Sequence, residues 1–223
     1  MKCVRFLHGI LLIFLALFLA VAGMAINSQA ASPLGSSLTS TADRQTGLQI
    51  ASKAKQALIV IFPFFGEQPY SETRSILENK GIKVQVASTS VDPMPGYDKK
   101  LTAKPDMLLS QVLTAEYDAI VFISAARYPG DNTDAIRIAK EGAAAGKVLA
   151  SHSYAISTLM KADLLNGKRV AAPSDLLPFL QKAGATVSDE ALVQDGRIIT
   201  AKPYSAPQPF AEAIAAALTA GAN

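Results

Sequence analysis

The sequence predicts an α/β fold in which a mostly parallel sheet carries helices on both faces. Three observations predict it. Continuous apolar runs at residues 57–62, 118–123 and 147–151 are typical of strands that are buried on both sides. Segments with the apolar spacing of helices separate these runs. Near the C-terminus, Asp195-Gly196 lies between two β-rich arms, which is a strong short-range signal for a short β-hairpin.

The expected elements follow in chain order from apolar runs, helix-ending glycines and turn residues. Strands are expected at residues 57–62, 83–88, 100–103, 118–123, 147–151 and 169–172, and in the two arms of a hairpin over 191–201. Helices are expected from residue 69 or 70 to residue 80, at residues 107–113 and 133–145, from about residue 154, and at residues 176–183 and 207–218. Residues 92–105 hold three prolines and are expected to form mainly turns. Asn132 is expected to cap the helix that follows it.

Residues 1–30 have the order of a secretory signal peptide. Lys2 and Arg5 give a positive start, residues 10–22 are uninterrupted apolar sequence, and residues 28–30 (SQA) form a small-x-small cleavage signal. The sequence therefore predicts an exported protein, either periplasmic or secreted.

An uncleaved membrane anchor is the alternative interpretation of this segment. Residues 6–26 just reach the length of about 20 residues that a bilayer span needs. The membrane would then be contacted only through the N-terminal segment. Residues 31–50 are rich in Ser, Thr and Gly and predict a flexible linker. Residues 51–220 fit one domain.

Composition excludes several functional classes. Loss of residues 1–30 removes Lys2 and Arg5, so the net charge falls from +3 to +1 (19 basic against 18 acidic residues). No basic cluster of the kind that binds phosphates remains, so no nucleic-acid partner is expected. The single cysteine, Cys3, leaves with the N-terminal segment. We therefore expect no disulfide, no thiol nucleophile, no metal site and no cofactor.

The stretch from residue 147 to residue 159 predicts a candidate site. A strand over 147–151 runs into a sharp turn at His152-Ser153, and a helix follows. Small residues, Ser151 and Ala155, lie two places on either side of Ser153, as in a nucleophile elbow. Ligands of open α/β sheets bind beyond the carboxyl ends of the strands. The side chains expected to line a small-molecule crevice there are Glu67, Ser124, Ala125, Tyr128, His152, Ser153 and Tyr154.

The order of several sequence pieces resembles the ThiJ/PfpI family of the class I glutamine amidotransferase-like superfamily. The pieces are ALIVIF, LENKGIKVQVAS, EYDAIVFI, AAGKVLAS, LLNGKRVAAP, GATVSDEALVQDGRIITA and SAPQPFAEAI. The resemblance covers about residues 55–218. It implies a flavodoxin-like sheet with a strand-turn-helix elbow, and it implies a homodimer.

The resemblance also implies that the catalytic positions are altered. The family has a cysteine at the elbow, often followed by histidine, where this chain has Ser153 and Tyr154. The family glutamate falls at Pro69, with Glu67 as a nearby carboxylate. A family glycine pair that helps to form an oxyanion site falls at about Ser124-Ala125.

Chemistry at the elbow would then need a general base for Ser153, because a serine hydroxyl is not ionised by a helix N-terminus alone. His152 is the only histidine after residue 30, and adjacent residues at a strand end point to opposite faces. Glu67 is the remaining candidate base. The sequence therefore favours a non-catalytic binding or interaction protein. A serine-dependent hydrolase or amidase that uses Ser153 is the alternative.

Each candidate also has a purely structural interpretation. The Ser153 hydroxyl is suited to cap the following helix, and His152 to form a buried hydrogen bond. Glu67 is also interpretable as a solvated loop carboxylate. Arg127 and Tyr128 follow a strand and suit either an anionic or aromatic ligand or simple loop packing.

Overall fold

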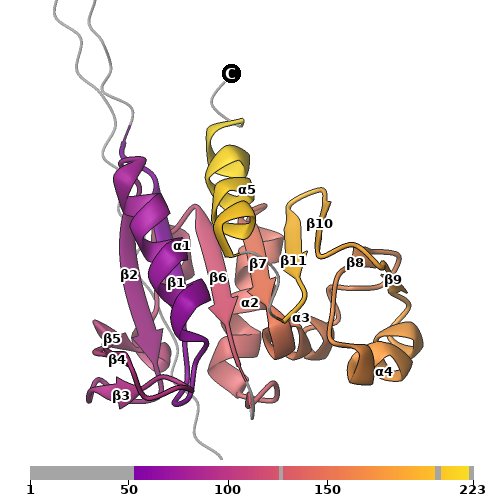
Figure 1. The fold of residues 1–223 in the computed structure, drawn as a ribbon. Helices are drawn as coiled ribbons and strands as arrows, with labels where there is room; N and C mark the ends of the chain where they lie inside the picture. Colours follow the sequence, from indigo (N-terminus) through magenta and orange to yellow (C-terminus); the bar gives the residue numbers. More distant parts are fainter. Residues whose placement is uncertain (1–52, 126–127, 204–206, 221–223) are drawn as a thin grey trace, which may run out of the picture. The chain divides into compact units, whose positions relative to one another are not determined.

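The computed structural model describes residues 53–125, 128–203 and 207–220, which lie in one compact unit, Ile50–Asn223. In these ranges a seven-stranded sheet has the order β10-β11-β7-β6-β1-β2-β5 (Figure 1). Neighbouring strands are parallel except for the antiparallel pair β10 and β11. The strands are β1 (Gln56–Val60), β2 (Lys83–Ser88), β5 (Met107–Leu108), β6 (Ala119–Ile123), β7 (Val148–His152), β10 (Leu192–Asp195) and β11 (Ile198–Ala201).

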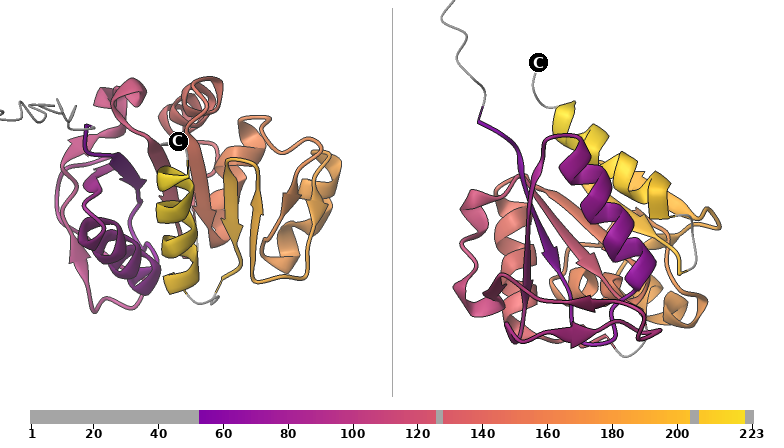
Figure 2. Two further views of the ribbon diagram at one scale, coloured as in Figure 1. Left: turned by 90° about the horizontal axis from the view of Figure 1, so that it is seen from above. Right: turned by 60° about the vertical axis from the view of Figure 1, so that its left-hand side comes forward.

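Helices cover both faces of this sheet, as Figure 2 shows from above. Helices α1 (Glu67–Asn79) and α5 (Pro207–Thr219) lie side by side on one face. Helices α2 (Thr133–Ala144) and α3 (Ile156–Lys161) lie on the other. Helix α4 (Leu177–Lys182) lies beyond the sheet edge, beside the two-stranded pair β8 (Arg169–Val170) and β9 (Thr186–Val187) (Figure 1). This is the mostly parallel, flavodoxin-like α/β fold that the sequence predicts.

Alternate residues of each central strand enter opposite cores because side chains alternate across a sheet. In β1, Leu58 and Val60 enter the core under α2 and α3, whereas Ala57 and Ile59 enter the core under α1 and α5. All four residues are fully buried. Burial on both faces explains why the strand is apolar without alternation, and it confirms the interpretation of such runs as central strands.

The helix predicted over residues 107–113 is wrong. Met107 and Leu108 form β5 and pair with Ala87 and Ser88 of β2, and only a 3₁₀ turn, Leu109–Gln111, follows. Asp106 explains the preference for strand here. Its carboxylate accepts a hydrogen bond from the Val86 N–H (2.8 Å), and its own N–H donates to the Val86 carbonyl (2.8 Å), which sets residue 107 in register beside β2.

Helix α1 begins earlier than predicted, at Glu67 rather than at Pro69 or Tyr70. A proline in the first turn of a helix is tolerated, because the missing N–H would have no partner within the helix. Glu67 is therefore the first residue of α1 and does not lie in a free loop, as its sequence context had suggested.

The proline-rich segment forms a small hairpin of β3 (Met94–Pro95) and β4 (Thr102–Ala103). It is fastened to the loop after β1: the Phe64 N–H donates to the Pro95 carbonyl, and the Tyr97 N–H donates to the Phe65 carbonyl, both at 2.9 Å. A parallel bridge joins Phe65 to Gly96 between these bonds. The strand predicted at residues 100–103 is confirmed in its second half.

The predicted signal segment and linker, residues 1–50, lie outside the described residues. Within the described ranges, every helix is too short or too polar to span a bilayer.

Candidate ligand site at the carboxyl edge of the sheet

The predicted elbow is a left-handed turn at Ser153. Strand β7 ends at His152, Ser153 has a φ of +62°, and a 3₁₀ turn over Ser153–Ala155 leads into α3. A left-handed backbone is unfavourable for a residue with a side chain, by about 1–3 kcal/mol, and persists only where the surroundings enforce it. The sharp strand-to-helix turn predicted from the sequence is therefore present at the predicted residue.

The pairing of β6 with β7 brings Ser124 to the same edge as Ser153. Ile123 lies opposite His152 in the parallel ladder, and Ser124 and Ser153 are the residues that follow the two strands. Both serines are buried, at 3% and 2% exposure. The Ser124 hydroxyl donates to the Ala125 carbonyl at 3.0 Å, which leaves its oxygen free only as an acceptor.

The loop before α1 closes against this edge at Gly66. A Cβ atom at Gly66 would lie 3.0 Å from the Ser124 carbonyl oxygen and 2.7 Å from Pro69 Cγ. Only glycine therefore fits here without a shift of its neighbours. Gly66 is not among the residues predicted from the sequence, although a glycine between the end of an apolar strand run and a helix was a signal for it.

Pro69 is the side chain that α1 contributes next to Gly66 and Ser124. It is buried and offers neither a donor nor an acceptor. The wall of the edge formed by α1 is therefore apolar at this point, and a polar ligand would find no hydrogen-bond partner on it.

Glu67 is held by the β3–β4 hairpin. Its Oε1 atom accepts a hydrogen bond from the Lys100 N–H at 3.0 Å, and its side chain occupies the space beside Gly96. Among the described residues, no hydrogen bond joins Glu67 to Ser153.

His152 lies on the sheet face that α1 and α5 cover. Its ring meets the ring of Phe210 in α5 edge-on, with centroids 5.7 Å apart, and only 4% of the residue is exposed. This placement agrees with the expectation that adjacent side chains at the end of a strand point to opposite faces of the sheet. The structure thus brings His152 into the hydrophobic core with Phe210.

Tyr128 packs against the loop and helix around it. Its ring meets Phe62 edge-on with centroids 5.1 Å apart, and its hydroxyl accepts a hydrogen bond from Thr158 of α3 at 3.0 Å. Burial of this hydroxyl raises the pKa of Tyr128 above its ordinary value, although part of the ring remains exposed. The predicted Arg127 lies outside the described residues.

Tyr154, which follows the elbow serine, reaches away from the sheet. Its hydroxyl donates to Asp175 Oδ2 at 3.1 Å, in the 3₁₀ turn that precedes α4. Ala125 is partly exposed next to Ser124. The structure therefore gathers Ser124, Ala125 and Ser153 at one edge, with Gly66 and Pro69 beside them, and holds Glu67, His152, Tyr128 and Tyr154 in other contacts.

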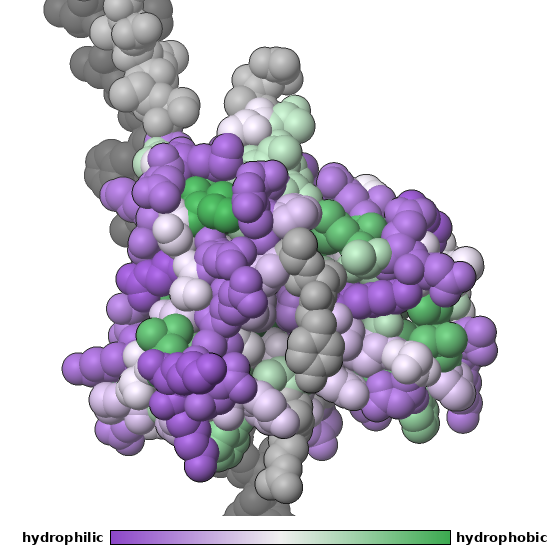
Figure 3. All heavy atoms as spheres, viewed as in Figure 1, coloured by the Kyte–Doolittle hydropathy of each residue, from purple (hydrophilic) through white to green (hydrophobic). Residues whose placement is uncertain are grey.

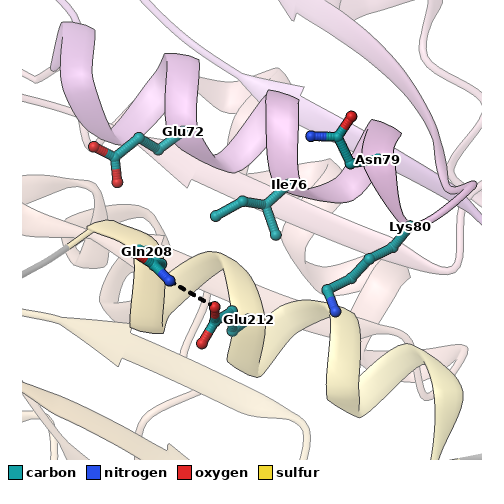
Figure 4. Close-up of a pocket in the computed structure, with 6 residues that line it drawn as sticks. All are labelled: Glu72, Ile76, Asn79, Lys80, Gln208 and Glu212. Carbon is teal, nitrogen blue, oxygen red and sulfur yellow. Dashed lines mark hydrogen bonds between the residues drawn. The ribbon is translucent and has the colours of Figure 1, made fainter.

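A groove with a volume of about 440 Å³ lies elsewhere, between α1 and α5 (Figure 4). Its lining residues are Glu72, Ile76, Asn79, Lys80, Gln208 and Glu212. Ile76 is the apolar residue of this lining, and the Gln208 side-chain amide donates a hydrogen bond to the Glu212 carboxylate at 2.9 Å. Because α1 runs away from the carboxyl edge of the sheet, this groove is separate from the elbow.

No group of three or more His, Cys, Asp or Glu side chains in the described ranges is arranged to hold a metal ion.

Comparison with known proteins decides the family. The model of the DJ-1/PfpI family matches residues 55–217. The chain belongs to the DJ-1/PfpI family. An uncharacterised protein of Methanocaldococcus jannaschii is 32% identical over 157 residues, which cover 67% of this chain and 76% of that protein. Protein dj-1beta of Drosophila melanogaster is 26% identical over 168 residues, 73% of this chain and 88% of the other.

Solved structures of DJ-1/PfpI proteins share the fold. A ThiJ/PfpI domain protein of Brachyspira murdochii superposes with a TM-score of 0.72 at 25% identity and covers 75% of this chain and 98% of its own. The crystal structure of Drosophila melanogaster DJ-1beta gives a TM-score of 0.68 at 24% identity, with coverage of 74% and 91%. The family resemblance and the flavodoxin-like fold predicted from the sequence are both confirmed.

Proposed function

We propose that this chain is an exported DJ-1/PfpI domain without the cysteine-based catalysis of its family, acting as a non-catalytic binding or interaction protein. The observation that carries the proposal is the surroundings of the elbow. In the described ranges, Ser153 has a strained backbone but no hydrogen bond from its hydroxyl to a carboxylate or an imidazole.

Three residues are the candidates for activating Ser153. Pro69, at the position of the family glutamate, has no polar side-chain atom. The Glu67 carboxylate is bound to the Lys100 N–H, and the His152 ring packs on Phe210. A serine hydroxyl needs a positioned base to become a nucleophile at neutral pH. These contacts support binding rather than chemistry at the elbow.

The ligand would be a small molecule held at the edge formed by Ser124, Ala125 and Ser153. The lining of this edge is weakly polar. Two buried hydroxyls and backbone groups lie on one side, and Pro69 lies on the other. Such a lining suits a small, uncharged ligand better than a strongly charged one, because no charged side chain is directed into it by a described contact.

A second candidate is a serine-dependent hydrolase or amidase. One observation favours it: the left-handed backbone of Ser153 after a buried strand has the geometry of a nucleophile elbow. Such strain is concentrated at functional sites in general. The candidate requires an activating group that approaches Ser153 in the presence of substrate.

Export and self-association complete the proposal. Export rests on the order of the N-terminal segment, and mature protein that begins near Ala31 or Ser32 by mass spectrometry would support it, whereas an intact N-terminus in the membrane fraction would contradict it. Self-association as a homo-oligomer rests on membership of the family.

The enzymatic test uses glyoxal-type aldehydes and short peptides with the purified protein. We expect turnover no faster than that of the Ser153→Ala variant, which removes the hydroxyl and keeps the small volume. Turnover that Ser153→Ala abolishes, with unchanged folding by circular dichroism, would overturn the non-catalytic proposal.

A further inference from the structure

We propose that one edge of the sheet docks onto anionic lipid headgroups at a membrane surface. This amino edge is the side on which the parallel strands begin (Figure 1), opposite the carboxyl edge that carries Ser153. The inference does not depend on whether Ser153 is catalytic. It extends the membrane contact expected of the N-terminal segment to the folded domain. The basic residues that define the amino edge are Lys53, Lys55, Lys80, Lys83, Lys147 and Arg197.

The order of the strands brings most of these residues into one row. Strands β11, β7, β6, β1 and β2 are consecutive neighbours in the sheet. Backbone hydrogen bonds align the strand starts: the Leu149 N–H donates to the Arg197 carbonyl, and the Lys83 N–H donates to the Lys55 carbonyl, both at 2.9 Å. Because neighbouring strands lie about 4.8 Å apart, the row is about 19 Å long. From β11 to β2, the residues at or just before the strand starts are Arg197, Lys147, Asp118, Lys55 and Lys83.

Most of the positive charge in this row has no carboxylate partner. Lys55 is paired with Asp118, with 3.2 Å between Nζ and Oδ1. Within the described ranges, Lys83, Lys147 and Arg197 form no ion pair. Lys83 and Arg197 are exposed, and Lys147 is partly exposed. An anion that binds these side chains would therefore not have to displace a carboxylate.

Two further lysines extend the basic surface beside the row. Lys80 is the C-cap of α1, close to the start of β2, and Lys53 precedes β1. Both are exposed, and neither forms an ion pair in the part of the chain that the structure describes. Nearby, Glu78 is already paired with Arg74 at 2.9 Å, whereas the exposed Glu116 offsets part of the charge. The chain after residue 30 has a net charge of only +1, so this edge concentrates positive charge that the rest of the surface balances.

The fold creates this surface from residues that are far apart in the chain. They are spread from residue 53 to residue 197, so the sequence contains no basic run. The expectation that no basic cluster remains after residue 30 therefore holds for the linear sequence but not for the folded domain. In the view of Figure 1, Figure 3 shows hydrophilic side chains around the end of α1 and the point where the chain enters the domain.

The attachment of the N-terminal segment favours a membrane as the partner. The described domain begins at Lys53, at the amino edge (Figure 1), and the preceding sequence contains the apolar run of residues 10–22. A linker with the Ser-, Thr- and Gly-rich composition of residues 31–50 spans about 25 Å on average. An uncleaved anchor would thus be tethered to the amino edge and not to the edge that carries Ser153. Basic residues close to an anchor attract anionic lipids, and the tether raises their effective concentration at the surface.

The side chains at this edge fit lipid headgroups better than nucleic acid. Binding of single-stranded nucleic acid relies on exposed aromatic rings on which bases stack. The exposed aromatic residues of the described ranges lie elsewhere: Phe64 in the loop after β1, Tyr97 beside β3 and Phe179 in α4. The amino edge therefore offers charge without a stacking surface, as a layer of lipid phosphates requires.

Docking through the amino edge would leave the candidate ligand site accessible. Ser153 follows β7 and Lys147 precedes it, so the two residues lie at opposite ends of this strand. The five residues of β7 alone separate them by about 17 Å. A lipid surface at Lys147 and a small molecule at Ser153 would therefore not compete.

The first test measures sedimentation of the purified full chain with lipid vesicles. Vesicles of phosphatidylcholine alone report binding through the apolar N-terminal segment, and vesicles that also contain phosphatidylglycerol add negative charge. We expect tighter binding to the second kind. Added sodium chloride should remove this difference, because salt screens the attraction between exposed charges.

A triple variant locates the lipid-binding surface. Lys83→Gln, Lys147→Gln and Arg197→Gln together should weaken binding to the phosphatidylglycerol-containing vesicles by about 100-fold, at the strength usual for basic residues near an anionic surface. Binding to phosphatidylcholine alone should not change. Urea unfolding shows whether the variant is folded, and Arg197→Gln alone, with an expected loss of about fivefold, repeats the test with one exposed side chain.

The matched control removes the same charge from the opposite edge. Lys99, Lys100 and Lys104 are exposed in and beside the β3–β4 hairpin. Their joint replacement by glutamine should change binding by less than about threefold, because charges more than a Debye length from the lipid are screened.

A fluorescent reporter tests the orientation. The sequence has no tryptophan, so Ala54→Trp places a single reporter at an exposed position of the amino edge, and Tyr97→Trp places one at a 53% exposed position near the hairpin. We expect vesicles with brominated phosphatidylglycerol to quench the reporter at residue 54 and to leave the reporter at residue 97 unquenched.

Each contrary outcome removes a different part of the proposal. Equal binding of the wild type to both kinds of vesicle would overturn lipid recognition by charge. Equal losses in the two triple variants, or equal quenching of the two reporters, would overturn the amino edge as the docking surface. Tighter binding of a DNA duplex than of the vesicles at the same salt concentration, abolished by the amino-edge variant, would replace lipid with nucleic acid as the partner.

Discussion

The Glu67 carboxylate accepts a hydrogen bond from the backbone N–H of Lys100, at 3.0 Å. This contact joins the first turn of α1 to the β3–β4 hairpin. A carboxylate at a helix N-terminus is also stabilised by the helix dipole. Glu67 therefore has a structural role that does not require chemistry at Ser153, although the sequence had made it the leading candidate for a general base.

Glu67→Ala should loosen the hairpin. The variant loses the acceptor for the Lys100 N–H, at a cost of about 1 kcal/mol, and the exchange of this amide with solvent should become about fivefold faster in a hydrogen-exchange experiment followed by NMR. Glu72→Ala removes the same charge from α1 away from the hairpin and serves as the control. Unchanged exchange at Lys100 in Glu67→Ala would show that the hydrogen bond is dispensable.

Ser153→Gly should leave the protein as stable as the wild type or more stable by up to about 1 kcal/mol, because glycine adopts a φ of +62° without steric cost. Ser153→Val should destabilise it by about 1–3 kcal/mol, because a β-branched residue strongly disfavours this conformation. Urea unfolding monitored by circular dichroism gives both values. The opposite order of Gly and Val would argue against strain at the elbow.

Asn132→Ala should destabilise α2 by about 1 kcal/mol. The Asn132 side chain accepts a hydrogen bond from the Ala135 N–H at 3.0 Å, which satisfies one of the free amides of the first turn. Asp131→Ala, at the exposed preceding position, is the control and should change the free energy of unfolding little. Equal effects of the two substitutions would mean that the cap contributes no stability of its own.

Asp118 should make stability depend on pH in the acidic range. Partial burial raises the pKa of its carboxyl, but the hydrogen bond from the Gln56 N–H and the ion pair with Lys55 outweigh burial, so the pKa in the folded state lies below its ordinary value. A lowered folded pKa means that the carboxylate stabilises the fold above the unfolded pKa, and that this stabilisation is lost as the pH falls through the folded value.

The corresponding measurement compares urea unfolding at pH 7 and at about pH 3. Asp118→Asn should be less stable than the wild type at pH 7, and the difference should shrink at the acidic pH. Asp131→Asn, an exposed aspartate next to α2, controls for the loss of a carboxylate. A difference between Asp118→Asn and wild type that stays constant with pH would contradict the assignment.

Much of the fold follows from the sequence because buried parallel strands are apolar throughout. The strands over residues 83–88 and 119–123 and the hairpin around Asp195-Gly196 lie where they are predicted. Asn132 caps α2 as predicted. The segment over 107–113 could not be assigned locally, because the hydrogen bonds of Asp106 to Val86, 20 residues away, decide it.

The candidate site is only partly predictable for a similar reason. The turn at Ser153 is encoded locally, by small residues on either side of the position that ends a buried strand. The engagement of Glu67 with Lys100 and of His152 with Phe210 depends on segments that are 33 and 58 residues distant in the chain. Spacing alone gives no measure of such contacts, so it could not decide between a base and a structural carboxylate.

In the proposed function, Ser153 is not an activated nucleophile. The most direct measurement is the intact mass of the native protein after incubation with a fluorophosphonate or a β-lactone probe, with peptide mapping of any adduct. We expect no adduct on Ser153 under conditions in which a control serine hydrolase is fully labelled. Stoichiometric labelling of Ser153 that disappears in Ser153→Ala and on unfolding would contradict it.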